Sequence, residues 1–203
     1  MRPKKYSYTV AAASAAGFMA TTTLTGAGPT FTTIAGAPGD GLAHLVSVTS
    51  AANINTIVFT INGTDANDNT VSTTVTGVNA NTVTGTVYFK TVTSVSISAT
   101  LGANTASVGW TAVAYSPILR LNYPGVGQAT IQCDVAGSTI NYTPLQSVSP
   151  VVADHTSMSW LAAVAAGATS TVTTCAQAAT AVRVLVNSHT SGVLKVSIAQ
   201  ARA

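Results

Sequence analysis

The sequence predicts an all-β protein built from antiparallel strands, and three observations lead to this fold class. The 203 residues are rich in Thr, Val, Ala, Ser and Gly and contain no Glu, a composition that favours strands over helices. Apolar and polar residues alternate along many short runs, which is the period of a half-buried strand. Gly, Asn and Asp separate these runs as turn formers. The combination is typical of β-sandwich-like units.

The first half of the chain is expected to form a series of strands joined by short turns. Residues 10–20 follow basic residues and imitate the apolar part of a signal peptide, but their small side chains and the Tyr and Thr before them favour a structural strand. Further strands are predicted over residues 57–61, 71–75, 83–89, 94–99 and 108–110. Because turn signals join neighbouring runs, we expect these strands to pair in order as an antiparallel meander.

The pattern breaks at residues 115–117, which predicts a boundary between two consecutive units. The first unit would cover residues 1–116 and carry an N-terminal arm, and a smaller second unit would cover residues 117–203. Strands of the second unit are predicted over residues 119–123, 128–135, 140–142, 182–186 and 194–198, the last two as a hairpin, with residues 160–166 as a candidate two-turn helix. Residues 92–97 and 179–184 share a pattern, which indicates a degenerate internal repeat.

Charged residues are scarce: eight Lys or Arg and five Asp or Glu make up 6% of the chain, against about 25% in ordinary soluble proteins. The net charge of +3 comes from Arg2, Lys4 and Lys5, so no basic stripe exists that could follow phosphates, and specific nucleic-acid binding is excluded. A neutral surface lowers the cost of burying large areas, which favours assembly with other subunits. Residues Arg2, Lys4, Lys5, Tyr6 and Tyr8 would form an interaction arm that hooks onto a neighbouring subunit.

No motif in the sequence predicts catalysis, a cofactor or a metal. The run Asp65 to Asn69 has alternating oxygen-bearing side chains like a Ca²⁺ loop, but it lacks the further acidic ligands and is better explained as a tight turn. The three His and five Asp are scattered, so we expect the protein not to be an enzyme. No apolar run approaches the roughly 18 residues of a membrane span.

Two further sets of residues have structural and functional interpretations. Cys133 lies in a predicted strand and is expected to be a buried apolar side chain rather than half of a bridge with Cys175. Five aromatic residues could form a sugar-stacking platform, although packing in the core is the favoured explanation: Trp110, Trp160, Tyr115, Tyr123 and Tyr142.

Four stretches together resemble β-rich virion proteins of tailed bacteriophages: residues 41–50, 63–69, 88–95 and 102–111. The similarity covers roughly Tyr8 to Pro117, and the second unit matches only loosely through residues 141–143, 160 and 181–184. The resemblance implies a structural component of the particle without catalytic residues to transfer, and it does not decide between the capsid shell and the neck or tail. Our leading hypothesis is a capsid-decorating or cement protein in many copies, which contacts the major capsid protein or other virion proteins and its own copies in virions assembled in the host cytoplasm. The alternatives are a neck or tail component, or a secreted bacterial surface module that binds glycans.

Overall fold

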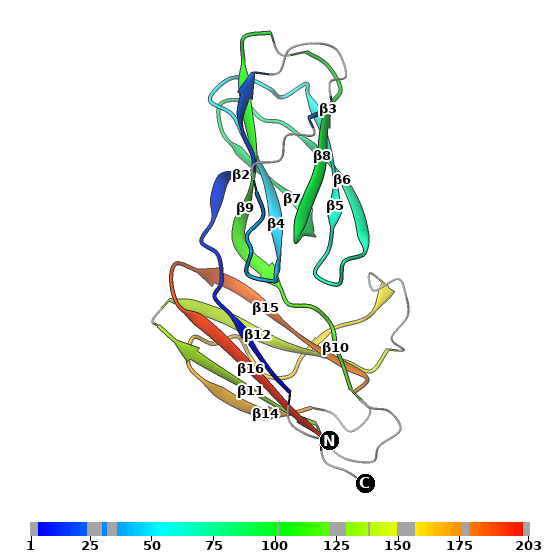
Figure 1. Cartoon of the computed structure of the whole chain (residues 1–203), viewed down its shortest axis with the longest axis vertical. Coiled ribbons are helices and arrows are strands. Elements are labelled where there is room, and N and C mark those ends of the chain that lie inside the picture. Colours follow the sequence, from blue (N-terminus) through cyan, green and yellow to red (C-terminus); the bar gives the residue numbers. More distant parts are fainter. Residues whose placement is uncertain are drawn as a thin grey trace. The chain divides into compact units, whose positions relative to one another are not determined.

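The computed structural model describes residues 4–23, 30–31, 36–100, 102–121, 129–137, 139–149, 157–175 and 179–200. The predicted all-β fold is confirmed, because antiparallel strands make up 64% of the structure and its described residues form no helix (Figure 1). The first nine strands are β1 (Lys4–Tyr8), β2 (Ser14–Thr23), β3 (Thr30–Phe31), β4 (Ala43–Thr49), β5 (Val58–Thr64), β6 (Thr70–Thr76), β7 (Thr82–Phe89), β8 (Thr91–Ile97) and β9 (Thr105–Tyr115). The others are β10 (Leu119–Arg120), β11 (Ala129–Ala136), β12 (Ile140–Ser147), β13 (Leu161–Ala162), β14 (Thr171–Thr174), β15 (Ala181–His189) and β16 (Val193–Gln200).

The chain forms two compact units, and one of them is inserted into the other. We call Ala11–Ala114 the nested unit, and Met1–Val10 together with Tyr115–Ala203 the terminal unit. The chain therefore passes between the units twice, at residues 10–11 and 114–115, and the second passage lies close to the boundary predicted after residue 116. The N-terminal residues were expected to belong to the first unit, but the structure assigns them to the unit that contains the C-terminus.

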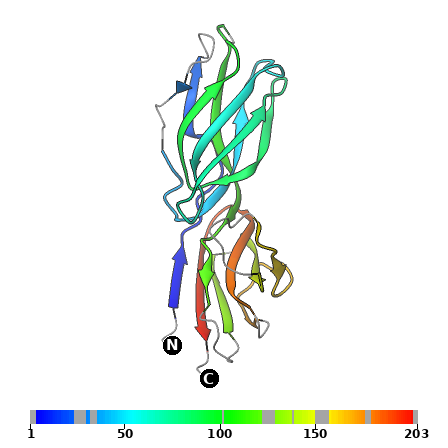
Figure 2. The same cartoon turned by 90° about the vertical axis from the view of Figure 1, so that its right-hand side faces the viewer.

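The strand β1 explains this difference. It pairs antiparallel with β16, with Lys4 opposite Ile198 and Tyr8 opposite Leu194, and Figure 2 shows β1 in dark blue beside β16 in red. The alternation of polar and apolar residues along one strand carries no information about a partner almost 200 residues away. The sequence therefore predicted an extended N-terminal segment without showing that it completes the sheet of the terminal unit.

The nested unit packs two groups of strands around one apolar core. One sheet has the order β3-β8-β5-β6; on the other side β9, β4 and β7 are neighbours and β2 pairs with β9. Side chains from both sides meet in the core, among them Phe18, Val46, Val48, Phe59, Ile61, Phe89, Val95 and Val108. At the positions Phe59 and Ile61 of β5, and Val95 and Ile97 of β8, the predicted alternation places apolar side chains inward.

The terminal unit is built in the same way. Its first sheet has the order β1-β16-β11-β14, and in its second group β13, β12 and β15 are neighbours while β10 pairs with β15. Inward side chains of both groups form the core, including Ile131, Cys133, Ile140, Tyr142, Val184, Val186, Leu194 and Val196. This arrangement buries one face of each sheet, as a sandwich requires.

The predicted meander and the predicted C-terminal hairpin are wrong. Among the described strands, β5 and β6 pair as neighbours in sequence over their full length and β12 pairs with the two residues of β13, whereas β11 and β12 lie in different sheets, and so do β15 and β16. Residues 160–166 contain the two-residue strand β13, Leu161–Ala162, and no helix. Alternation fixes the buried face of each strand and turns fix its ends. A short turn can, however, lead to a strand of the same sheet or across the core to the opposite sheet. The tertiary packing decides between the two, and the local sequence pattern does not show it.

Candidate functional site

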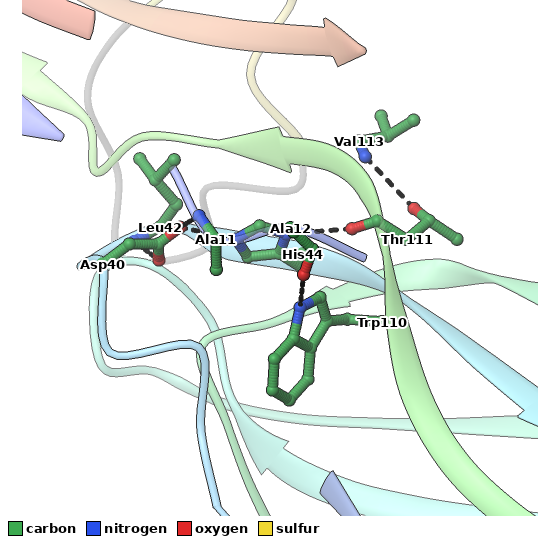
Figure 3. Close-up of polar contacts among 8 residues, drawn as sticks. All are labelled: Ala11, Ala12, Asp40, Leu42, His44, Trp110, Thr111 and Val113. Carbon is green, nitrogen blue, oxygen red and sulfur yellow. Dashed lines mark hydrogen bonds and ion pairs between the residues drawn. The ribbon is translucent and has the colours of Figure 1, made fainter. Parts of the chain in front are cut away.

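The nested unit contains a buried Asp–His pair (Figure 3). The Nε2 atom of His44, in β4, is 2.8 Å from Oδ2 of Asp40, and the two side chains are 0% and 2% exposed. The backbone N–H of Ala11 donates to the same Oδ2 at 2.8 Å, and that of Leu42 donates to Oδ1 at 3.0 Å. On its other side, His44 Nδ1 lies 3.0 Å from the carbonyl oxygen of Thr111 in β9.

The protons of this cluster follow from the partners. A carbonyl oxygen only accepts, so Nδ1 of His44 carries a hydrogen and donates it to Thr111. Burial alone would raise the pKa of the Asp40 carboxyl, but the hydrogen bond and charge of His44 and the amides of Ala11 and Leu42 outweigh it. The pKa of Asp40 is therefore lowered from its ordinary value of 3.8, so its carboxylate stays ionised beside the ring of His44.

Local sequence positions each member of the cluster. Gly39 and Gly41 on either side of Asp40 have φ angles of 74° and 79°, a conformation that glycine adopts without steric cost and that turns the carboxylate towards β4. Next to Ala11, the carbonyl oxygen of Ala12 accepts a hydrogen bond of 2.9 Å from the indole nitrogen of Trp110. Ala11 and Ala12, the first residues of the nested unit, are thus held by two side chains: Asp40, which accepts a hydrogen bond, and Trp110, which donates one.

The geometry of the pair fits a clamp and does not fit a reactive site. Both ring nitrogens of His44 have partners and the ring is fully buried, so it has no lone pair directed at a substrate or metal. Through Asp40 the pair binds Ala11, the first residue of the nested unit, and through His44 it binds Thr111, three residues before the end of that unit. The pair thus connects the beginning of the nested unit to its last strand. Sequence reasoning missed it, although a His inside the apolar run 42–48, four residues after an Asp between two glycines, was a usable signal.

The terminal unit contains a second cluster, centred on Arg183 of β15. The guanidinium carbon lies 3.9 Å from the ring centroid of Tyr115 and 4.2 Å from that of Trp160. All three side chains are half-buried. A cation between two aromatic faces is attracted by both ring quadrupoles, so this stack ties the strand β15 to residues that come before β10 and before β13.

The residues of the predicted interaction arm lie in β1, except Arg2, which is outside the described residues. Lys4 and Lys5 are exposed, Tyr6 is half-buried, and Tyr8 is buried against the core of the terminal unit. Burial raises the pKa of Tyr8 to about 12, with a smaller contribution from Tyr6. The segment is therefore an edge strand of its own sheet, and the contact of this arm with a neighbouring subunit stays a prediction.

The run Asp65 to Asn69 forms a tight turn. Asp65 Oδ1 accepts hydrogen bonds from the backbone N–H groups of Asn67 and Asn69 at 2.8 and 2.9 Å, and Asp68 has a φ of 65° and pairs with Lys90 at 2.7 Å. The carboxylate of Asp65 thus stabilises the turn, as expected for an Asx turn, and that of Asp68 forms an ion pair with Lys90. Within the described ranges, no group of three or more His, Cys, Asp or Glu residues is placed to hold a metal ion.

The aromatic residues do not gather into a sugar-binding platform. Trp110 and Tyr142 are buried in the cores of different units, and the hydroxyl of Tyr142 donates to the carbonyl oxygen of Thr169 at 2.7 Å. Tyr115 and Trp160 each have one ring face covered by Arg183. Tyr123 is outside the described residues.

Both cysteines are free and buried. Cys133 lies opposite Thr171 in the β11–β14 ladder, whereas the amide of Cys175 donates to the carbonyl oxygen of Ala129, four residues before Cys133 in β11. Four residues of strand span about 13 Å, which exceeds the roughly 7 Å that a disulfide can bridge. Burial raises the pKa of Cys133 to about 12, with a smaller effect of Asp134, and burial raises the pKa of Cys175 to about 11.

Comparison of the chain with known protein families, curated protein sequences and solved structures finds no match. In the parts of the chain that the structure describes, no helix is long and apolar enough to cross a membrane. The fold and its clusters define a class: an all-β protein of two sandwich-like units, one nested in the other and stabilised by a buried Asp–His clamp.

Proposed function

We propose that this chain is a structural protein of a tailed-phage virion that decorates or cements the capsid shell through uncharged surfaces. The observation that carries the proposal is the outer face of the sheet formed by β5, β6 and β8, three strands that contain no charged residue. We call this the hydroxyl face and define it by Thr60, Asn62, Thr64, Thr70, Ser72, Thr74, Thr76, Thr91, Ser94 and Ser96.

Four polar side chains of the hydroxyl face form hydrogen-bonded pairs across the strands. Asn62 Nδ2 donates to Ser94 Oγ at 3.1 Å, and the hydroxyls of Thr64 and Thr91 are 2.7 Å apart. Groups that already have partners lose less when water is removed, and without charges there is no ion to desolvate. Such a face supports burial against another protein over a large area.

The other interpretations have less support from the structure. A glycan-binding module would use exposed aromatic rings, but Trp110 and Tyr142 are buried and the other described rings of the set stack on Arg183. A neck or tail role has the same surface requirements as decoration, and the two differ in copy number and position. In each virion role, the partners would be the major capsid protein or other virion proteins and copies of this chain.

The position and number of copies in the particle test the proposal. Imaging of virions carrying a label on the chain should place it over the shell, and quantitative mass spectrometry should find many copies per particle. A few copies at one vertex would overturn the decorating role and favour the neck or tail.

Binding to shells that lack the chain tests the surface itself. Thr74→Lys puts a charge in the middle of the hydroxyl face, opposite Thr60, and should weaken co-sedimentation with shells. Thr84→Lys, an exposed position on β7 in the other sheet of the same unit, is the matched control and should bind as the wild type does. Equal binding by both variants would remove the hydroxyl face from the interface.

A further inference from the structure

The first sheet of the terminal unit has two edges that differ in charge. The order β1-β16-β11-β14 leaves β1 at one edge and β14 at the other. On β1, Lys4 lies opposite Ile198 and so has its side chain on the core-facing side, while Lys5 lies opposite Ser197 on the outer side. Lysines at an edge, and above all one on the core-facing side, prevent another strand from adding to it.

The β14 edge has no such protection. Its four residues, Thr171–Thr174, are uncharged, and the chain contains no charged residue or His between residues 156 and 182. Val172 is 63% exposed on the outer face, opposite Gln132 of β11. Among the described strands, β14 pairs only with β11.

Exposed apolar side chains are concentrated in the unit that contains β14. Thr173 Oγ1 donates to the carbonyl oxygen of Ala163, two residues after Leu161, which is 66% exposed and belongs to the other sheet. The exposed large apolar side chains found in the described residues, Val148, Leu161 and Val172, all belong to the terminal unit. An uncharged edge with exposed apolar side chains indicates an interaction site.

We infer that β14 pairs antiparallel with β14 of a second copy of the chain, across a two-fold axis. Self-pairing at β14 brings no like charges together, whereas self-pairing at β1 would place the lysines of two copies side by side. Two-fold edge pairing is antiparallel by symmetry, so it continues the antiparallel order of the sheet from one copy into the next. The second copy is thus the occupant that the neutral edge fits.

The axis is defined by the faces of the strand. Residues directly opposite each other in a sheet have their side chains on the same side. The cores of the two copies therefore lie on the same side of the joined sheet only if one residue of β14 pairs with the same residue of the other copy, with the axis between them. An axis beside Val172 brings the two exposed valines into contact, each shielding the other from water. This inference deepens the proposed role in assembly and rests on it for its biological purpose, but its test involves neither shells nor virions.

The first test is the oligomeric state of the purified full chain, measured by sedimentation velocity over a wide range of concentration. Wild-type protein and the control Ser7→Lys, which adds the same charge to the exposed outer side of β1, should be dimers. Val172→Lys should raise the dimer dissociation constant by about tenfold or more. Its circular dichroism and Trp160 fluorescence should match the wild type, because Val172 is on the surface.

A monomeric wild type, or equal weakening by Val172→Lys and Ser7→Lys, would overturn the inference. Cross-linking gives a second readout: Val172→Cys should form a covalent dimer in air, with Cys133 and Cys175 silent because they are buried. The control Ser7→Cys should remain uncross-linked. If cross-linking instead required a mixture of the Val172→Cys and Ser7→Cys proteins, the contact would be head-to-tail and the two-fold pairing would be refuted.

Discussion

Removal of the Asp40 carboxylate should lower the free energy of unfolding of the nested unit strongly, although Asp40 itself lies in a loop. In Asp40→Ala the N–H groups of Ala11 and Leu42 and the Nε2 of His44 lose their acceptor in a place that water does not reach. Breaking a buried pair by deleting one partner typically costs about 3–5 kcal/mol, a large part of the 5–15 kcal/mol that stabilises a domain. Asp40→Asn keeps one acceptor oxygen and should cost less.

The assay uses the two tryptophans, since Trp110 lies in the nested unit and Trp160 in the terminal unit. In a Trp160→Phe background, fluorescence during urea unfolding reports the nested unit alone. Asp68→Asn, in the same unit, is the matched control, because its exposed carboxylate pairs with Lys90 and Asn also adopts a φ of 65°, so stability should change by less than about 0.5 kcal/mol. The clamp would be refuted if Asp40→Ala left the Trp110 transition where the control leaves it.

The pH dependence gives a further check on Asp40. Its pKa is lower in the folded protein than the ordinary 3.8, so the ionised carboxylate contributes stability above that pH. The contribution is lost as the pH falls through the folded value. The difference in stability between wild type and Asp40→Asn should therefore be constant near neutral pH and shrink below about pH 4. A difference that grew on acidification would contradict the sign of the shift.

Three other changes test the packing. Gly109→Ala should destabilise the nested unit by about 3 kcal/mol in the same fluorescence assay, because a Cβ at this position of β9 overlaps the backbone of Ser14 in β2; an unchanged midpoint would mean that β2 does not lie there. Arg183→Leu should lower the free energy of unfolding of the terminal unit by about 1 kcal/mol for each of the two rings that stack on the guanidinium. The measurement is the fluorescence of Trp160 in a Trp110→Phe background, and an unchanged free energy of unfolding would show that the stack does not stabilise the unit. Cys133 and Cys175, with pKa values of about 12 and 11, should resist a thiol reagent at pH 8 in the folded protein and both react in urea, whereas rapid native labelling would contradict their burial.

The strands themselves could be predicted from the sequence because their signals are local. The alternation around Phe59 and Ile61 marks β5, and the Asp and Asn residues after it mark the turn to β6. In the C-terminal part, alternation around Val196 marks β16 in the same way. Each of these features depends on residues within about ten positions of one another, which a single sequence shows directly.

Pairing and the clamp could not be predicted because they depend on contacts between distant residues. Tyr8 pairs with Leu194, and Asp40 accepts a hydrogen bond from the amide of Ala11. These contacts arise from the folded arrangement of the chain, and no regular spacing in the sequence indicates them. The insertion of the nested unit has the same origin, since nothing within residues 1–10 shows that their partner strand ends the chain. In the sequence, the two members of this buried Asp–His pair look like two isolated polar residues.

The scarcity of charge takes on a different meaning once the charged residues are placed. Asp40 is used in the clamp, Asp65 holds a turn, Asp68 pairs with Lys90, and Lys4 stands at the edge β1. A random dilution of charge would leave the two edges of the terminal sheet alike and would scatter a few charges over every exposed sheet face. Instead, no described strand of the nested unit contains a charged residue, and in the first sheet of the terminal unit the edge β14 has none while the opposite edge has two lysines. The charge of this sheet is therefore placed at one edge, and a lysine introduced on β14 should disturb assembly in a way that the same lysine on β1 does not.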